Sequence, residues 1–317
     1  MRSGKISESI LKRSVIKLID YKNKNVIQGA GVGQDCSVMD AGDRYILTST
    51  ECALTGTHLG PYYAVVRAVN NIAACGGNPV SASAAFILKE DFDERRLKEL
   101  TRLVVSACRE CGIQLAGGHT EITSNAVKDM VSVTVTGFCH KERYRSLKAV
   151  QPGMDIIATG WIAMEQTAIL LEEHSEELLN RLPESYVAGT AGYLSSSNVI
   201  REAQLAAENG AVGMHDVAEG GIFAALWEFA QGSGCGLSVN LRDIPVKQET
   251  VEFCEVFGLN PYQMPSTGSL LIAVNNGPAI TEVFKQQGIN AVVIGRTTAD
   301  NDKKIINGDE VRFLDKP

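Results

Sequence analysis

The sequence lacks long apolar runs, is poor in aromatic residues and has an excess of acidic side chains. None of its apolar stretches approaches the ~18 residues that a membrane helix requires. The first residues also lack the continuous apolar segment of a signal peptide, so we expect a cytoplasmic protein with no membrane partner. Aromatic residues make up 6% of the chain and the net charge is −7, which argues against nucleic acid as a partner.

Cysteine patterns typical of metal sites are missing as well. Eight cysteines are scattered through apolar segments, and Cys108 and Cys111 form one close pair late in a predicted helix. No second pair or histidine set completes a zinc site. We therefore favour reduced core cysteines over a metal or redox site.

The composition is that of a globular protein large enough for two cores. The chain has 317 residues, of which 44% are hydrophobic and 21% charged, and about 150 residues per domain predicts two domains. The turn signal Gln151-Pro152-Gly153 separates residues 1–152 from residues 153–317.

Hydrophobic periodicity predicts strands and helices in both halves. In the first half we expect strands at 36–40, 45–50, 80–88, 113–116 and 130–138, and helices at 6–21, 61–75 and 93–111. In the second half we expect strands at 155–159, 237–241, 269–274, 291–297 and 303–314, and helices at 161–173, 175–181, 197–209, 218–231, 246–257 and 278–287. Consecutive strands without a helix between them exclude a purely parallel sheet, so the predicted fold class is α/β with two mixed domains.

A glycine-rich stretch, Gly29-Ala30-Gly31-Val32-Gly33-Gln34-Asp35, is the first candidate for chemistry. Its backbone N–H groups can surround an anion, and Asp35 can hold a cation that bridges to it. The stretch is neither a P-loop nor a dinucleotide fingerprint, because it lacks Gly-Lys-Ser/Thr and follows no strand. Alone, such a stretch is more often a simple turn.

The helix at 61–75 is apolar or small at nearly every position, which predicts burial all round. Arg67, Asn70 and Asn71 are the exceptions, and their spacing places them on one face. A polar stripe on a buried helix needs partners. A structural network and a ligand-binding face are both open.

Gly117-Gly118-His119-Thr120-Glu121 follows a short predicted strand and combines close backbone approach with potential ligands. His119 could equally be a histidine in a surface turn. The stretch as a whole is therefore a candidate site with a structural alternative.

His215-Asp216-Val217-Ala218-Glu219-Gly220-Gly221 opens a predicted helix. Asp216 and Glu219 fit a capping box, which would be a structural role. Gly220 and Gly221 would expose N–H groups at a helix N-terminus, where phosphate is favoured. Both roles remain open.

Taken in order, these segments resemble the AIR synthase superfamily over nearly the whole chain, with the HypE-like branch the most similar. The superfamily includes HypE, selenophosphate synthetase and thiamine-monophosphate kinase. The motifs that carry the resemblance are Gly33-Gln34-Asp35-Cys36-Ser37, Thr48-Ser49-Thr50-Glu51, Val69-Asn70-Asn71-Ile72-Ala73-Ala74-Cys75-Gly76-Gly77-Asn78-Pro79, Gly117-Gly118-His119-Thr120, Gln151-Pro152-Gly153, Met214-His215-Asp216-Val217-Ala218-Glu219-Gly220-Gly221 and Ser266-Thr267-Gly268-Ser269-Leu270-Leu271.

The resemblance implies an N-terminal domain that forms a homodimer and a C-terminal domain that closes an ATP cleft. It implies ATP and Mg²⁺ as cofactors, a small-molecule substrate and a maturation-pathway protein as a further partner. The implied metal ligands are Asp35, Glu51 and Asp216. The residues implied to bind the nucleotide are Asp35, Asn70, Asn71, Gly117, Gly118, His119, Asp216, Gly220 and Gly221.

Three positions within these motifs depart from the family pattern. Asn71 and His119 stand where many members have Asp, and Glu51 stands where Asp is usual. Fewer carboxylates predict weaker Mg²⁺ binding, a different ion, or a site in which Glu121 and Asp216 take over part of the coordination.

A further departure concerns the substrate carrier. HypE itself carries its substrate group on a C-terminal cysteine, whereas the last cysteine here is Cys254. We therefore expect ATP-dependent phosphoryl transfer to an amide, carbamoyl or phosphate oxygen of a small molecule. One alternative is hydrogenase maturation by carbamoyl dehydration. The other is a catalytically inactive nucleotide-binding or regulatory dimer.

Overall fold

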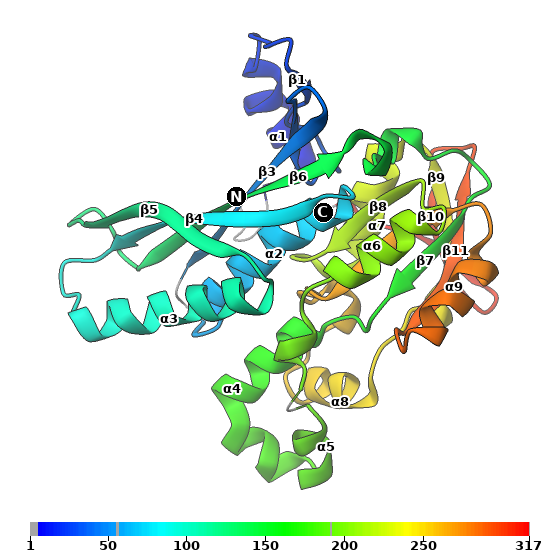
Figure 1. Cartoon of the computed structure of the whole chain (residues 1–317). Helices are drawn as coiled ribbons and strands as arrows, with labels where there is room; N and C mark the ends of the chain where they lie inside the picture. Colours follow the sequence, from blue (N-terminus) through cyan, green and yellow to red (C-terminus); the bar gives the residue numbers. More distant parts are fainter. Residues whose placement is uncertain (1–5, 55–56, 191, 317) are drawn as a thin grey trace.

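Two β-sheets form the body of the molecule in a computed structural model that describes residues 6–54, 57–190 and 192–316 (Figure 1). The strands of the first sheet are β1 (Val26–Gln28), β2 (Ser37–Asp40), β3 (Arg44–Leu54), β4 (Asn78–Leu88), β5 (Gln114–Ile122) and β6 (Met130–His140). The helices of this half are α1 (Glu8–Ser14), α2 (Gly60–Ala74) and α3 (Glu94–Glu110).

The second sheet lies in the other half of the chain. Its strands are β7 (Asp155–Thr159), β8 (Gly213–Val217), β9 (Gly236–Asn240), β10 (Ser269–Val274), β11 (Ala291–Thr298), β12 (Lys303–Asn307) and β13 (Glu310–Phe313). The helices are α4 (Met164–Arg181), α5 (Glu184–Gly189), α6 (Ile200–Glu208), α7 (Gly221–Ser233), α8 (Gln248–Val256) and α9 (Gly277–Gln286). In the part of the chain described, none of the helices has the length and apolar character needed to cross a bilayer.

Both sheets are mixed, as the consecutive strands predicted. The first has the order β1-β2-β3-β6-β4-β5, and its pairs are antiparallel except β4 with β5. The second has the order β13-β12-β9-β11-β7-β10-β8, and there β9 and β12 are the parallel pair. The predicted fold class is confirmed.

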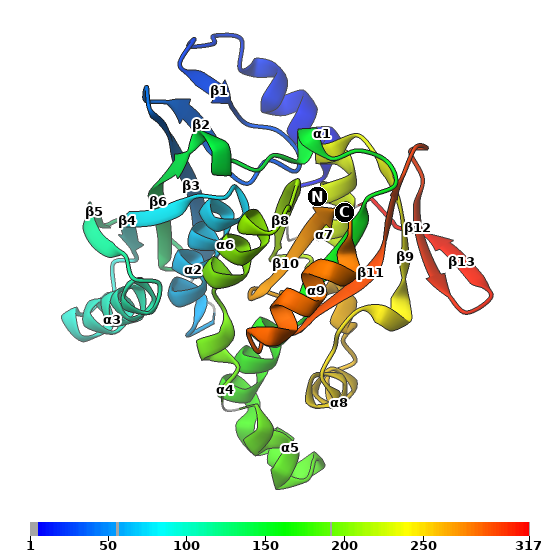
Figure 2. The same ribbon diagram turned by 45° about the vertical axis from the view of Figure 1, so that its right-hand side comes forward.

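Helix α2 is buried along its whole length because it lies between the two halves. Every residue from Pro61 to Ala74 is buried. One side of α2 packs on β3 and β6, and the other meets β8 and α6 (Figure 2). Near its end, Ala73 and Ala74 join a core that includes Leu270 and Ile272 of the second sheet. The helix that the sequence predicted to be buried all round therefore connects the two cores.

Several predicted boundaries were wrong by a few residues. The first helix is shorter than 6–21, since α1 ends at Ser14 and a 3₁₀ turn covers Ile16–Leu18. The strand predicted at 113–116 continues to Ile122, because β5 pairs with β4 along its length. The strand predicted at 303–314 is a hairpin of β12 and β13.

The predicted capping box at Asp216 and Glu219 was also wrong. Residues Gly213–Val217 form strand β8, which pairs with β10 and is buried at every position. Helix α7 starts later, after Gly220, whose φ of +82° only glycine adopts readily. The polar pair His215-Asp216 hid this strand, because buried strands are usually recognised by apolar residues.

Two glycines that end helices offer a matched test of close packing. Gly76 follows α2 with φ +78°, and a Cβ there would lie 2.1 Å from the carbonyl oxygen of Arg143. Gly112 follows α3 with φ +67° and has open space around it. We predict that Gly112→Ala lowers the free energy of unfolding by about 1 kcal/mol, the cost of a left-handed backbone. Gly76→Ala should cost about 1–3 kcal/mol more, because it adds overpacking. If urea unfolding shows equal losses of unfolding free energy for the two variants, the close packing at Gly76 is contradicted.

Candidate functional site

A cavity of about 530 Å³ opens between the two halves of the chain. Its volume lies within the ~300–1,000 Å³ typical of small-molecule sites. The walls come from α1, the loop at 29–36, β3 and α2 on one side. The end of β8, the turn after it and α7 form the other side. Both sheets therefore contribute to one cavity.

The glycine-rich loop reaches this cavity by packing tightly on α7. Gly33 has φ +68°, and a Cβ there would lie 2.3 Å from the carbonyl oxygen of Glu228 and 3.0 Å from the Cα of Gly232. No larger residue fits without moving the loop or the helix. This close approach places Asp35, two residues later, against the second half of the chain.

Asp35 meets His215 of β8 at the inner end of the loop. The Oδ1 atom of Asp35 lies 2.6 Å from Nδ1 of His215, and Oε2 of Glu228 lies 3.4 Å from Nε2 of the same ring. Asp216 is the next residue along β8 and lines the cavity as well. His215 was not among the predicted site residues. Its place in the motif beside Asp216 was the signal that could have identified it.

The charges around His215 act on its titration in opposite directions. Burial lowers the pKa of His215, but the nearby carboxylates of Asp35 and Glu228 outweigh it and hold the pKa well above its ordinary value. Without another cation, this ring is the local counter-charge to the two carboxylates.

The cavity lining is strongly acidic. Among the residues that the structure describes, the lining has no Lys or Arg and contains six carboxylates: Glu8, Asp35, Glu51, Asp216, Glu219 and Glu228. A polyphosphate would be repelled from such a lining unless cations lay between them. Carboxylate oxygens suit Mg²⁺, so these acidic side chains fit the ion that the resemblance implies. Asp35 and Asp216 would hold it where the two halves of the chain meet, and Glu51 lines the same cavity from β3.

Asn71 lines the cavity beside Glu51. Its Nδ2 atom donates hydrogen bonds to Ser49 Oγ at 2.9 Å and to Glu51 Oε1 at 3.0 Å. Ser49 and Glu51 both lie on β3, so the amide joins α2 to the first sheet. The side chain thus lines the cavity while it also orients a carboxylate.

Asn70 points elsewhere, although it is adjacent in sequence. It is fully buried, its Nδ2 donates to the carbonyl oxygen of Ser197 at 3.0 Å, and its Oδ1 accepts from the N–H of Val199 at 3.0 Å. These bonds hold the segment that leads into α6. In this chain Asn70 does not line the cavity.

The glycines predicted to contact phosphate lie outside the cavity lining. Gly117, Gly118 and His119 lie on β5, the exposed edge strand of the first sheet, where His119 Nε2 is 3.2 Å from Glu121 Oε2. Gly220 and Gly221 form the turn into α7. A Cβ on Gly221 would lie 2.6 Å from the carbonyl oxygen of Tyr262, so packing alone accounts for this glycine.

Two family models match the chain. The model for the AIR synthase related protein, N-terminal domain, covers residues 33–139, and that for the C-terminal domain covers residues 151–307. The chain belongs to the AIR synthase-related family. Carbamoyl dehydratase HypE of Rhodobacter capsulatus is 29% identical over 265 residues, which span 82% of this chain and 75% of the relative.

Solved structures of the family share this fold. HypE in the HypE–HypF complex superposes with a TM-score of 0.77 at 20% identity, covering 97% of this chain and 99% of that one. The hydrogenase maturation protein HypE in complex with ATP gives a TM-score of 0.71 at 19% identity, covering 99% and 96%. The resemblance to the AIR synthase superfamily and its HypE-like branch is confirmed.

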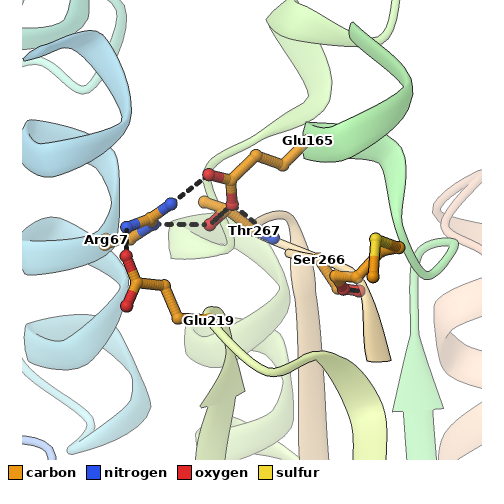
Figure 3. A network of polar contacts seen from close by, with 6 residues as sticks. Arg67, Glu165, Glu219, Ser266 and Thr267 are labelled. Atoms are coloured by element: carbon orange, nitrogen blue, oxygen red, sulfur yellow. Dashed lines mark hydrogen bonds and ion pairs between the residues drawn. The ribbon is translucent and has the colours of Figure 1, made fainter. Parts of the chain in front are cut away.

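In this member of the family, a buried arginine joins the two halves beside the cavity (Figure 3). Arg67 on α2 forms an ion pair with Glu165 in the first turn of α4, and its Nη1 lies 2.8 Å from Oε1 of Glu219. Thr267 Oγ1 donates to Glu165 Oε2 at 2.5 Å and accepts from Arg67 Nε at 3.4 Å. The polar stripe of α2 therefore has partners, and Glu219 links the network to the cavity wall.

The turn before β10 holds this network in place. Ser266 Oγ accepts the N–H of Ala163 at 2.7 Å and donates to the carbonyl oxygen of Met264 at 2.7 Å. Ala163 has φ +58°, an unusual conformation for a residue with a side chain. Its bond to Ser266 stabilises that conformation, which starts α4 in the position that aims Glu165 at Arg67.

We predict strong coupling between Arg67 and Glu165. Arg67→Met should lower the free energy of unfolding by about 3–5 kcal/mol, because it leaves the Glu165 carboxylate buried and without its cation. The double variant with Glu165→Met should lose much less than the sum of the single variants. Urea unfolding of the four proteins in the cycle measures the coupling, and additive losses would show that the pair acts independently.

Proposed function

We propose that this chain binds ATP with divalent cations in the cavity and transfers a phosphoryl group to an oxygen of a small molecule. The carrying observation is the meeting of Asp35 and Asp216, from opposite halves of the chain, at the inner end of an acidic cavity. The fold that this chain shares with HypE in complex with ATP supports the choice of nucleotide. An amide, carbamoyl or phosphate oxygen would be the acceptor.

Each wall has a distinct part in this proposal. Asp35, Glu51 and Asp216 hold the cations, which neutralise charge on the phosphates. The N–H groups of the glycine-rich loop contact phosphate oxygens directly. Asn71 orients Glu51 and contacts either a phosphate or the acceptor. Catalysis then consists of positioning and charge neutralisation, with no covalent nucleophile on the protein.

The proposal places Gly117, Gly118 and His119 at a homodimer interface. These residues lie on an edge strand whose outer backbone groups are available for pairing. In a dimer they would act toward the nucleotide of the partner subunit. A second maturation protein is a further proposed partner, since HypE forms a complex with HypF.

A second candidate reaction is carbamoyl dehydration in hydrogenase maturation. It is favoured by the 29% identity to carbamoyl dehydratase HypE. A third reading, a nucleotide-binding dimer without turnover, is favoured by Asn71, an amide where many members have a carboxylate. Measuring phosphate release from ATP separates the three readings. Release with small amides supports phosphoryl transfer, and release with a carbamoylated thiol compound supports carbamoyl dehydration. Release with neither supports a nucleotide-binding dimer without turnover.

Trp227 lines the cavity and can report nucleotide binding. In a Trp161→Phe background it is the single tryptophan. We predict that Asp35→Asn in this background weakens the affinity for ATP with Mg²⁺ about tenfold or more, because it removes a ligand charge from the cation. Asn71→Ala should weaken it less, since it leaves all three proposed cation-binding carboxylates in place.

Asp91→Asn is the matched control, because Asp91 lies in an exposed turn before α3 and pairs with Lys89. Circular dichroism and urea unfolding establish that each variant is folded. Unchanged affinity in a folded Asp35→Asn variant would remove Asp35 from the site. Absence of ATP binding by the parent protein would overturn both enzymatic readings.

A further inference from the structure

We propose that His215 is a nitrogen ligand of the divalent ion that Asp35 and Asp216 bind, so that the site prefers a transition-metal ion to Mg²⁺. The inference rests on the proposed function for one point, namely that this ion lies where the nucleotide phosphates would bind. Its evidence is the side-chain arrangement around β8.

The three side chains converge as a metal site requires. Asp35, His215 and Asp216 each present one ligand atom, and these atoms all lie within 4.8 Å of one another. His215 is 4% exposed and Asp216 5% exposed, so the ring and one carboxylate are fixed by the surrounding protein. The packing of Gly33 on α7 fixes the third, because it sets the position of the loop that carries Asp35.

The imidazole ring of His215 lies close to two carboxylates but forms a well-oriented hydrogen bond with neither. Nδ1 lies 2.6 Å from Asp35 and Nε2 lies 3.4 Å from Glu228. Even so, neither ring nitrogen has a hydrogen bond of acceptable geometry to any described residue. A buried polar group in this state is costly. An ion bound at Nδ1 would displace the proton from that nitrogen to solvent and use its lone pair, while Nε2 would keep its proton.

Glu228 supplies the second half of the arrangement. Histidine ligands usually donate their other ring N–H to a carboxylate, which fixes the tautomer and the ring orientation. Here Nε2 faces Glu228 of α7 while Nδ1 faces Asp35. A small rotation of the Glu228 side chain would complete a carboxylate–histidine–metal sequence.

The donor set decides the class of ion. One imidazole nitrogen with two carboxylates suits Mn²⁺, Fe²⁺, Co²⁺ or Zn²⁺, whereas Mg²⁺ prefers oxygen ligands throughout. Water and phosphate oxygens would fill the remaining positions. The competing explanation is that a protonated His215 serves as an internal counter-charge for Asp35 and Glu228, which would keep metal ions out.

Metal binding by the full chain, measured without nucleotide, distinguishes these explanations. Chelator-treated protein is titrated with Mn²⁺ alone, and the bound ion is examined by pulsed electron paramagnetic resonance. We expect one Mn²⁺ per chain with a ¹⁴N coupling from imidazole, and Mn²⁺ binding at least about tenfold tighter than Mg²⁺ in competition. Co²⁺ should give visible absorption bands of a mixed nitrogen and oxygen site.

His215→Gln should abolish the ¹⁴N coupling and weaken Mn²⁺ binding at least about tenfold, while Glu228→Gln should keep the coupling and weaken binding less. His140→Gln is the matched control, because His140 is an exposed histidine at the end of β6. Mn²⁺ bound without ¹⁴N coupling in the wild-type chain, or no Mn²⁺ binding at all, would overturn the inference. The wild-type spectrum decides the question even where a variant fails to fold.

The nucleotide is absent from this experiment, so the two proposals fail separately. ATP binding with an all-oxygen Mn²⁺ signal would contradict the nitrogen ligand and leave the proposed function standing. A ¹⁴N-coupled ion in a chain that does not bind ATP would support the nitrogen ligand and contradict the proposed function.

Discussion

The contact between the glycine-rich loop and α7 is the constraint on which the rest of the site depends. Because Gly33 has no side chain, the loop lies directly against the backbone of Glu228 and Gly232. This contact brings Asp35, from one half of the chain, to His215 on the other. The acidic cavity exists only while the two halves keep this distance, so its shape depends on how the two halves of the chain pack.

Helix α2 maintains that packing from within. It is buried along its whole length, and each polar side chain on it serves a different connection. Arg67 reaches the second half through Glu165 and Thr267, Asn70 holds the segment before α6, and Asn71 turns toward β3. A buried arginine with two carboxylates couples the domains electrostatically, and it keeps Glu219 at the cavity edge. Stability of the interface and shape of the site are therefore linked.

Much of this was accessible from the sequence because it is local. Apolar periodicity located α2, α3 and most strands, and glycines after Ala74 and Cys111 marked helix ends. Ordered short motifs over both halves pointed to the AIR synthase-related family, and they included Asp35, Glu51, Asn71 and Asp216, which all line one cavity. Motif order along a chain is a property of sequence alone, so this part needed no structure.

Only the tertiary structure decided which candidates meet. Strand β8 was hidden because His215 and Asp216 are polar, and it is buried against β10 and α2, which are distant in sequence. The sequence predicted that Asn70 and Asn71 share one helix face with Arg67, yet their hydrogen bonds go to different halves of the chain. Gly117, Gly118 and His119 form another motif of the same family pattern but lie on an outer edge of the first sheet. Residue type and spacing determined what chemistry each segment could offer. Long-range packing determined which segments share a cavity, because local hydrophobic periodicity carries no information about contacts between distant segments.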